Sequence, residues 1–201
     1  AAAVRMATPL LFAGLGEWLS ERSGVVNLGI EGIMALGALV AFLGAYFTGS
    51  LWLGTALALA AGIALGLVQA ALAVSLGVSQ HVAGLGLTIF ASGLALYVHR
   101  LVLGTPATPP HVTPFAPVHL RALSEIPFAG PILFGQYALT YLALLLLAVL
   151  SFLVYRTRWG LSLRAAGENP AAADAAGINV IRVRYAAVAL GAGRMGRGAA
   201  F

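Results

Sequence analysis

Residues 51–78 are the segment that most restricts the fold, because no charged side chain occurs anywhere along them. A helix needs about 20 mostly apolar residues to cross the hydrocarbon core of a bilayer. This run is longer than that, so it spans with a tilt or overhangs the membrane. We therefore expect residues 51–78 to form a transmembrane helix.

Other apolar runs of similar length lie on both sides of this segment. Residues 25–47, 81–103 and 137–155 each qualify as a span. The shorter run 6–20 is either the end of a first span or a helix lying at the membrane interface. With 61% hydrophobic and only 8% charged residues, the composition is far from that of a soluble domain. The sequence therefore predicts an all-α fold, a polytopic transmembrane helical bundle of about five spans, with residues 1–201 forming a single domain.

The charged residues predict the orientation of the bundle. All 11 basic residues are arginines, and residues 156–184 contain several of them close to span ends. Basic loops stay on the cytoplasmic side, so the loop 156–184 should be cytoplasmic and the loop 104–136 extracytoplasmic. The outer loop is rich in proline, which rules out a long helix there and favours extended or turn structure. Its prolines are Pro106, Pro109, Pro110, Pro114, Pro117, Pro127 and Pro131.

Composition and motifs also exclude several classes of activity. Without lysine the chain has no P-loop lysine to reach nucleotide phosphates, so any ATP chemistry has to come from a partner. Without cysteine it has no disulfide and no thiolate zinc site, and its four histidines have no metal-ligand spacing. Enzyme motifs are missing, as is a basic stripe interleaved with aromatic residues. We expect no catalytic residues, no cofactor, no metal and no nucleic acid as a partner.

Small residues recur at every fourth position along residues 54–70. On a helix they form one stripe, along which another backbone can approach closely. This pattern favours a compact bundle over isolated anchors. The stripe consists of Gly54, Ala58, Gly62, Gly66 and Ala70.

A short polar insert, GENPAAADAAGI at residues 167–178, has its own helix start and stop signals. Asn169 is a favoured N-cap, and Pro170 suits the first helical position. Gly177 provides the left-handed residue that ends a helix, and Glu168 lies near its positive end. We expect a helix of about two turns. Such a helix is too short to be stable alone, so it needs another surface to bind to. The alternative is an ordinary capped helix in a loop between two spans.

Two blocks of the sequence resemble one transporter family. GLSLRAAGENPAAADAAGINVIRVRY, residues 160–185, is similar to the cytoplasmic coupling segment of ABC importer permeases of the ribose and branched-chain amino acid type. ATPLLFAGLGEWLSERSGVVNLGIEGIMALGA, residues 7–38, resembles the N-terminal signature of the subgroup for nucleosides and simple sugars. The resemblance covers residues 1–190 and therefore includes the apolar runs between the two blocks.

This resemblance implies an inner-membrane permease subunit, embedded in membrane lipid, that has no ATPase activity of its own. Its implied partners are a cytoplasmic ABC ATPase subunit, a second permease subunit and an extracytoplasmic solute-binding protein. The ATPase subunit pushes on a coupling helix of the permease. Carried over to this chain, the ATPase-coupling residues are Gly160, Arg164, Gly167, Glu168, Asn169, Pro170, Asp174 and Gly177.

The last residues of the chain depart from the family pattern. Family members continue with further spans, which makes this chain resemble the N-terminal part of a longer domain. Arg194 and Arg197 fall where an apolar helix is expected, and an arginine at a helix centre opposes insertion by about 2.5–3.5 kcal/mol. We therefore expect a truncated or frameshifted end in residues 191–201.

Polar residues within the spans are candidates for the substrate pathway. Glu31 is the only ionisable group within 25–47, and Asn27 lies one helical turn before it. Gly29 and Gly32 are positioned to let the helix break and present backbone carbonyls to a polar solute. The alternatives for Glu31 are a tie to Arg22 or a backbone group, and a proton relay. Weaker candidates are Thr88 and Ser92, since hydroxyls of this kind often bond to their own helix.

Together these observations predict the permease subunit of an ABC importer that moves nucleosides or simple sugars with ATP hydrolysed by a partner. An ion-coupled secondary carrier of small polar solutes is one alternative, which calls for several intramembrane carboxylates and inverted repeats. A truncated, non-functional permease remnant is another.

Overall fold

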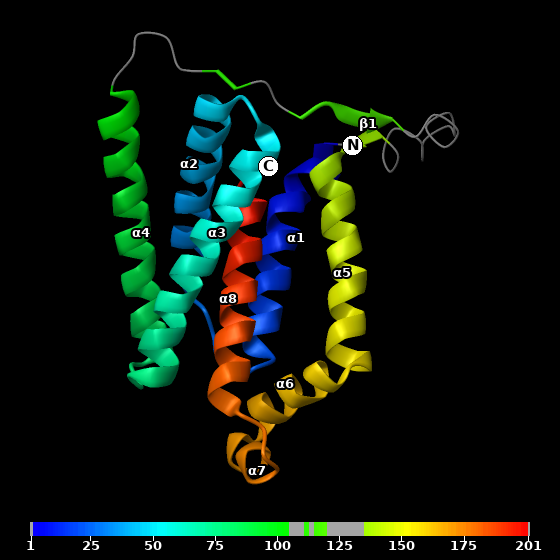
Figure 1. Ribbon diagram of the computed structural model, residues 1–201. Helices are drawn as coiled ribbons and strands as arrows, with labels where there is room; N and C mark the ends of the chain where they lie inside the picture. The colour runs from blue at the N-terminus through cyan, green and yellow to red at the C-terminus, as the bar shows by residue number, and fades with distance from the viewer. Residues whose placement is uncertain (1, 105–110, 113–114, 120–134, 201) are drawn as a thin grey trace.

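The structure is a computed structural model, and it describes residues 2–104, 111–112, 115–119 and 135–200. The described part is a helical bundle with a single two-stranded ribbon at one end (Figure 1), which confirms the predicted all-α fold. The elements are α1 (Ala2–Glu21), α2 (Ile30–Thr48), α3 (Leu51–Ala70), the π-helical turn η1 (Ala71–Ser75), α4 (Gln80–Leu103), β1 (Pro117–His119), β2 (Gly135–Tyr137), α5 (Ala138–Arg156), α6 (Arg158–Glu168), α7 (Pro170–Ala175) and α8 (Val180–Gly198).

Within the described residues, four helices are long and apolar enough to cross a membrane. They are α2, α4, α5 and the continuous helix Leu51–Ser75. The predicted run 6–20 is part of α1, which stands upright beside α5 and α8 and is therefore not an interfacial helix (Figure 1). Both α1 and α8 are as long as a span but more polar, and they complete the bundle.

One predicted span begins later than its apolar pattern indicates. The pattern predicts a continuous helix over residues 25–47, but α1 ends at Glu21 and α2 begins only at Ile30. Gly24 has φ +82°, a conformation that breaks a helix and that glycine adopts at low cost. Residues 22–29 therefore form a non-helical segment within the depth of the bundle, and we call it the unwound segment.

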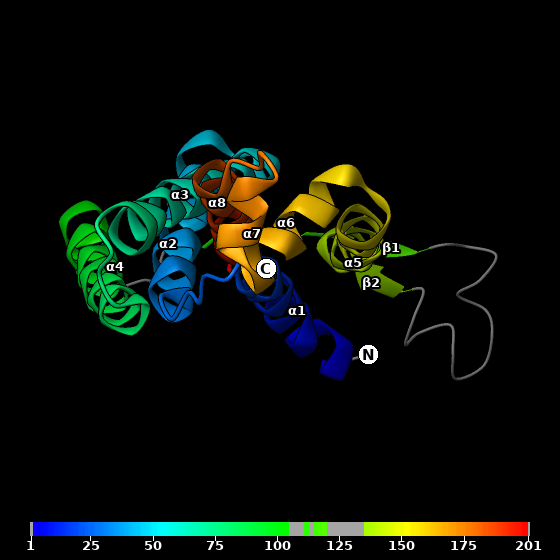
Figure 2. The ribbon, with the colours of Figure 1, turned by 90° about the horizontal axis from the view of Figure 1, so that it is seen from below.

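Helix α8 is the central helix, with α1, α2 and α3 packed around it (Figure 2). Its packing depends on the predicted stripe, because a Cβ on Gly62 would clash with the backbone oxygen of Ala192. A Cβ on Gly16 of α1 would clash in the same way with the backbone oxygen of Gly191. The stripe on α3 is therefore a helix-packing surface, as predicted.

The two arginines near the end of the chain do not interrupt α8, which stays helical to Gly198. The expectation of a truncated or frameshifted end rests on these two arginines and on the further spans of family members. On the buried sides of α8, glycine and alanine residues contact the neighbouring helices. Arg194 and Arg197 lie on a different side of the helix. There Arg194 is partly exposed, and its Nη1 donates to the backbone oxygen of Leu190 at 2.9 Å.

The ribbon lies at the opposite end of the bundle from α7. Strands β1 and β2 pair antiparallel, with Val118 opposite Gln136. Pro117 begins β1, so the predicted extended structure is confirmed at this proline, and the other six prolines of the loop lie outside the described residues. Arg5 of α1 attaches to the ribbon, because its Nη2 donates to the oxygen of Gly135 at 3.3 Å.

Candidate functional site

Helix α6 lies across the ends of α1, α5 and α8, and we call this end of the bundle the α7 end. Thr157 caps α6, since its hydroxyl accepts a hydrogen bond from Gly160 N at 3.1 Å. Leu163 is fully buried in a cluster with Leu19, Leu150 and other apolar residues of α1, α5 and α8. The helix is therefore fixed to three neighbouring helices, α1, α5 and α8, by its apolar face.

Helix α7 follows α6 and projects beyond the bundle (Figure 1). Its predicted caps are confirmed: Asn169 Oδ1 accepts from Ala172 N at 3.0 Å, and Pro170 occupies the first turn. Gly177 has φ +83°, as the predicted stop requires. Ala173 is the one buried residue of α7, so the helix presents most of its surface outward.

The eight predicted coupling residues fall into two groups. The exposed group surrounds α7 and comprises Glu168, Asn169, Pro170, Asp174 and Gly177. The inward group lies on α6, where Gly160 packs against the backbone oxygens of Leu153 and Val154, and Gly167 against that of Arg22. Arg164 belongs to the inward group as well, with Cζ 5.5 Å from the centre of the Tyr155 ring.

One further residue, Arg184 of α8, joins this region and was not among the predicted site residues. Its Nε donates to the backbone oxygen of Ser23 at 3.1 Å, and its Nη2 donates to that of Ala166 at 3.3 Å. A single guanidinium therefore connects the end of α6 with the start of the unwound segment. In the sequence, Arg184 is one more arginine of a basic loop, and only the tertiary contacts distinguish it.

Side chains from α1 and α4 hydrogen-bond the backbone of the unwound segment. Gln80 Oε1 accepts from Val26 N at 2.8 Å, and its Nε2 donates to Gly24 O at 3.3 Å. Glu17 Oε1 accepts from Asn27 N at 2.8 Å, and Thr88 Oγ1 donates to Leu28 O at 3.2 Å. Non-helical backbone at membrane depth requires partners of this kind.

Four of the six predicted pathway residues lie together where the unwound segment meets α4. Asn27 is fully buried, and its Oδ1 accepts from Gly29 N at 3.0 Å. A Cβ on Gly32 would lie 2.6 Å from the Cα of Thr88, so the backbones of α2 and α4 touch there. The alternative that the Thr88 hydroxyl bonds to its own helix is wrong, since Leu28 O accepts that bond.

The other two predicted pathway residues lie apart from this contact. Glu31 is exposed, and the suggested tie to Arg22 is not formed: Arg22 Nη2 donates to Tyr155 Oη at 3.1 Å. Ser92 lines an open cleft of about 510 Å³ between α2 and α4, opposite Ala35 and Leu39.

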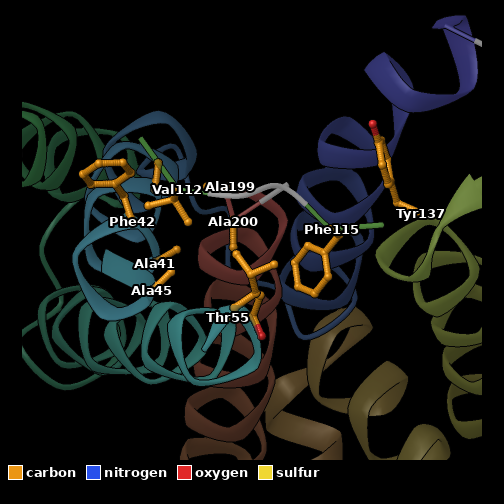
Figure 3. A pocket seen from close by; sticks show the side chains of 11 residues that line it. Ala41, Phe42, Ala45, Thr55, Val112, Phe115, Tyr137, Ala199 and Ala200 are labelled. Carbon is orange, nitrogen blue, oxygen red and sulfur yellow. The ribbon is translucent and has the colours of Figure 1, made fainter. Parts of the chain in front are cut away.

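A second hollow of about 450 Å³ lies at the ribbon end, between α2, α3 and the segment before β1. Three aromatic residues line it, Phe42, Phe115 and Tyr137, together with Thr55 and several alanines (Figure 3). Aromatic rings and a hydroxyl offer stacking surface and one polar contact to a small organic solute.

Four helices in the described part of the chain are long and apolar enough to cross a membrane and, packed with α1, α8 and an unwound segment supported by side chains, they define a polytopic membrane protein. The chain belongs to the family described as branched-chain amino acid transport system / permease component, whose profile matches residues 1–196. It is therefore a multi-pass protein of the cell inner membrane that belongs to a family of transport-system permease components.

Three relatives carry more specific names. TsgC13 of Haloferax volcanii, provisionally named a glucose ABC transporter permease protein, is 41% identical over 97% of this chain and 59% of its own length. The guanosine ABC transporter permease protein NupQ of Bacillus subtilis is 38% identical over 90% of this chain and 59% of its own length. The nucleoside ABC transporter permease protein NupC of Lactococcus lactis is 33% identical over 91% of this chain and 60% of its own length. The chain thus spans about three fifths of these relatives, and no solved structure matches it significantly.

Proposed function

We propose that the chain is the N-terminal part of the permease subunit of an ABC importer, and that a cytoplasmic ATPase subunit binds at α7. The observation that carries this proposal is the exposure of a capped helix too short to be stable alone. Its exposed residues are small or polar, so a groove on a partner can enclose the helix from several sides. Binding of a cytoplasmic ATPase subunit at α7 requires the loop 156–184 to be cytoplasmic and the loop 104–136 to be extracytoplasmic.

Movement of α7 has a direct route into the bundle. Helix α6 ends at Glu168, immediately before the N-cap of α7, and Arg184 connects its Ala166 to Ser23. Residues 24–29 continue from this contact into the bundle and lead to α2. We propose that a push on α7 shifts the unwound segment and α2 relative to α4, which alternates access to the pathway.

The proposed substrates are nucleosides or simple sugars, because the names of the relatives specify glucose, guanosine and nucleosides. The proposed pathway lies along α2 and α4 and includes Asn27, Gly29, Glu31, Gly32, Thr88 and Ser92. A second permease subunit completes it, and an extracytoplasmic solute-binding protein delivers the solute at the ribbon end.

Replacement of Gly177 by valine tests the coupling role. Gly177 has φ +83°, and no atom lies within 4 Å of the place a Cβ would take, so the change strains the end of α7 without a steric clash. A β-branched residue in this conformation costs about 1–2 kcal/mol. We expect the full-length importer to keep its fold and to hydrolyse ATP, but with less solute moved per ATP.

Gly77 and Gly49 provide matched controls. They have φ +64° and +68° and equally open surroundings, but they lie in other loops. Valine at either site should leave the amount of solute moved per ATP hydrolysed unchanged. Equal ratios in all three variants would refute the coupling role, and failure of an ATPase subunit to co-purify with the permease would instead favour the ion-coupled carrier.

A further inference from the structure

Two arginines at the α7 end share one aromatic ring. Arg22 Cζ lies 5.7 Å from the centre of the Tyr155 ring and 5.8 Å from that of Trp18. Arg164 approaches the same tyrosine, with Cζ at 5.5 Å. We call Arg22 and Arg164 the arginine pair. The three helices α1, α5 and α6 together position it.

The arginine pair has no anion of its own. No salt bridge of either guanidinium to a carboxylate occurs in the part of the chain that the structure describes. Arg164 Nε is buried there without a hydrogen-bond acceptor. The nearest carboxylates along the chain, Glu21 and Glu168, are exposed. Arg22 Nη2 donates to Tyr155 Oη at 3.1 Å, and no carboxylate offsets the two like charges held around this ring, so a bound anion would stabilise the pair.

The surroundings favour a phosphate attached to a lipid. Guanidinium groups match phosphate oxygens in geometry, and tryptophan and tyrosine are typical of the boundary between membrane and water. Above the pair, one face of α5 carries Tyr155, Phe152 and Leu145, with exposed fractions of 48%, 61% and 59%. This apolar stripe runs from the charged end toward the middle of the bundle, as an acyl chain beside α5 would.

We propose that the arginine pair is a binding site for the phosphate of an anionic phospholipid, whose acyl chains lie along the exposed face of α5. The guanidinium groups bind the headgroup, and the Tyr155 ring keeps both in place. The site includes Arg164, which is also one of the predicted coupling residues, so its test measures stability in lipid rather than transport.

The test measures the thermal unfolding of the full-length protein in neutral detergent with added lipid. Phosphatidylglycerol should raise the unfolding temperature more than phosphatidylcholine does. Arg22→Gln and Arg164→Gln should each raise about fivefold the phosphatidylglycerol concentration that gives half of the stabilisation, from the typical contribution of one arginine near a lipid surface. Arg182→Gln is the matched control, because Arg182 is exposed and lies on α8, and it should respond like the unchanged protein.

Two measurements on the unchanged protein keep the proposal testable if a variant does not fold. Equal stabilisation by both lipids would overturn it. Inorganic phosphate that reproduces the full effect of phosphatidylglycerol would also overturn it, because the site would then bind free anions. Loss of the preference for phosphatidylglycerol in Arg182→Gln as well would indicate general surface charge and would likewise count against the arginine pair.

Discussion

Replacing Arg184 with methionine removes the link between α6 and the unwound segment while keeping an unbranched, flexible stem, although a shorter one than that of arginine. Two hydrogen bonds are lost, of 3.1 Å to Ser23 O and 3.3 Å to Ala166 O. Hydrogen bonds of charged groups contribute about 1.5–3 kcal/mol each. The bond to Ala166 O is long and the side chain is partly exposed, so we expect a combined loss of about 2 kcal/mol, below the roughly 3 kcal/mol of two such bonds at their weakest.

A loss of this size makes separation of the two segments about 30 times more frequent. If Arg184 transmits movement from α7, the amount of solute moved per ATP hydrolysed should fall by up to the same factor. The assay reconstitutes the full-length importer in vesicles and measures uptake and phosphate release in the same sample. Arg184→Lys keeps the charge but not the fork of donors, so it should give an intermediate ratio.

Arg182→Met is the control for this prediction, since it removes an equal charge from an exposed position two residues earlier. The refuting result is a ratio of uptake to hydrolysis in Arg184→Met equal to that of Arg182→Met. A normal ratio in Arg184→Met together with a reduced ratio in Gly177→Val would reject the route through Arg184 and leave the role of α7 intact.

Two further predictions concern packing and the pathway. Gly62→Leu should destabilise the bundle by about 1–3 kcal/mol in thermal unfolding, because a Cβ there would clash with the backbone of α8. Gly93→Leu, with no atom within 4 Å, is the control, and equal effects would contradict the close helix contact. Glu31→Gln should lower uptake without lowering the unfolding temperature, because Glu31 is exposed on α2; unchanged uptake would remove Glu31 from the pathway.

The sequence predicts α7 well because the signals for its ends are local. Asn169, Pro170 and Gly177 act within a few residues of one another, and each does in the structure what its chemistry favours. The apolar spans are predictable for the same reason, since length and hydropathy are properties of a single segment.

The unwound segment was predicted only in part, since Gly29 and Gly32 indicated a break but not that the helix begins only at Ile30. Its backbone is satisfied by Gln80 and Thr88, which lie more than 50 residues further along the chain. Apolar residues such as Val25 and Val26 give the sequence the pattern of a continuous span, and distant partners override it. The arginines of α8 mislead for a related reason, because charge counted along one helix does not reveal that these side chains are partly exposed or that Arg194 donates to Leu190 O of its own helix.

Pro170 connects the shape of α7 with its attachment to the bundle. A proline disfavours helical backbone in the residue before it, and Asn169 accordingly has φ −146°, which separates α6 from α7. Proline also lacks an N–H, so it cannot donate to Ala166 O four residues earlier, and Arg184 supplies that bond from another helix. The proline ring therefore has two effects: it separates α6 from α7, and it leaves Ala166 O free to accept the hydrogen bond from Arg184. A substitution of Pro170 would change both effects together.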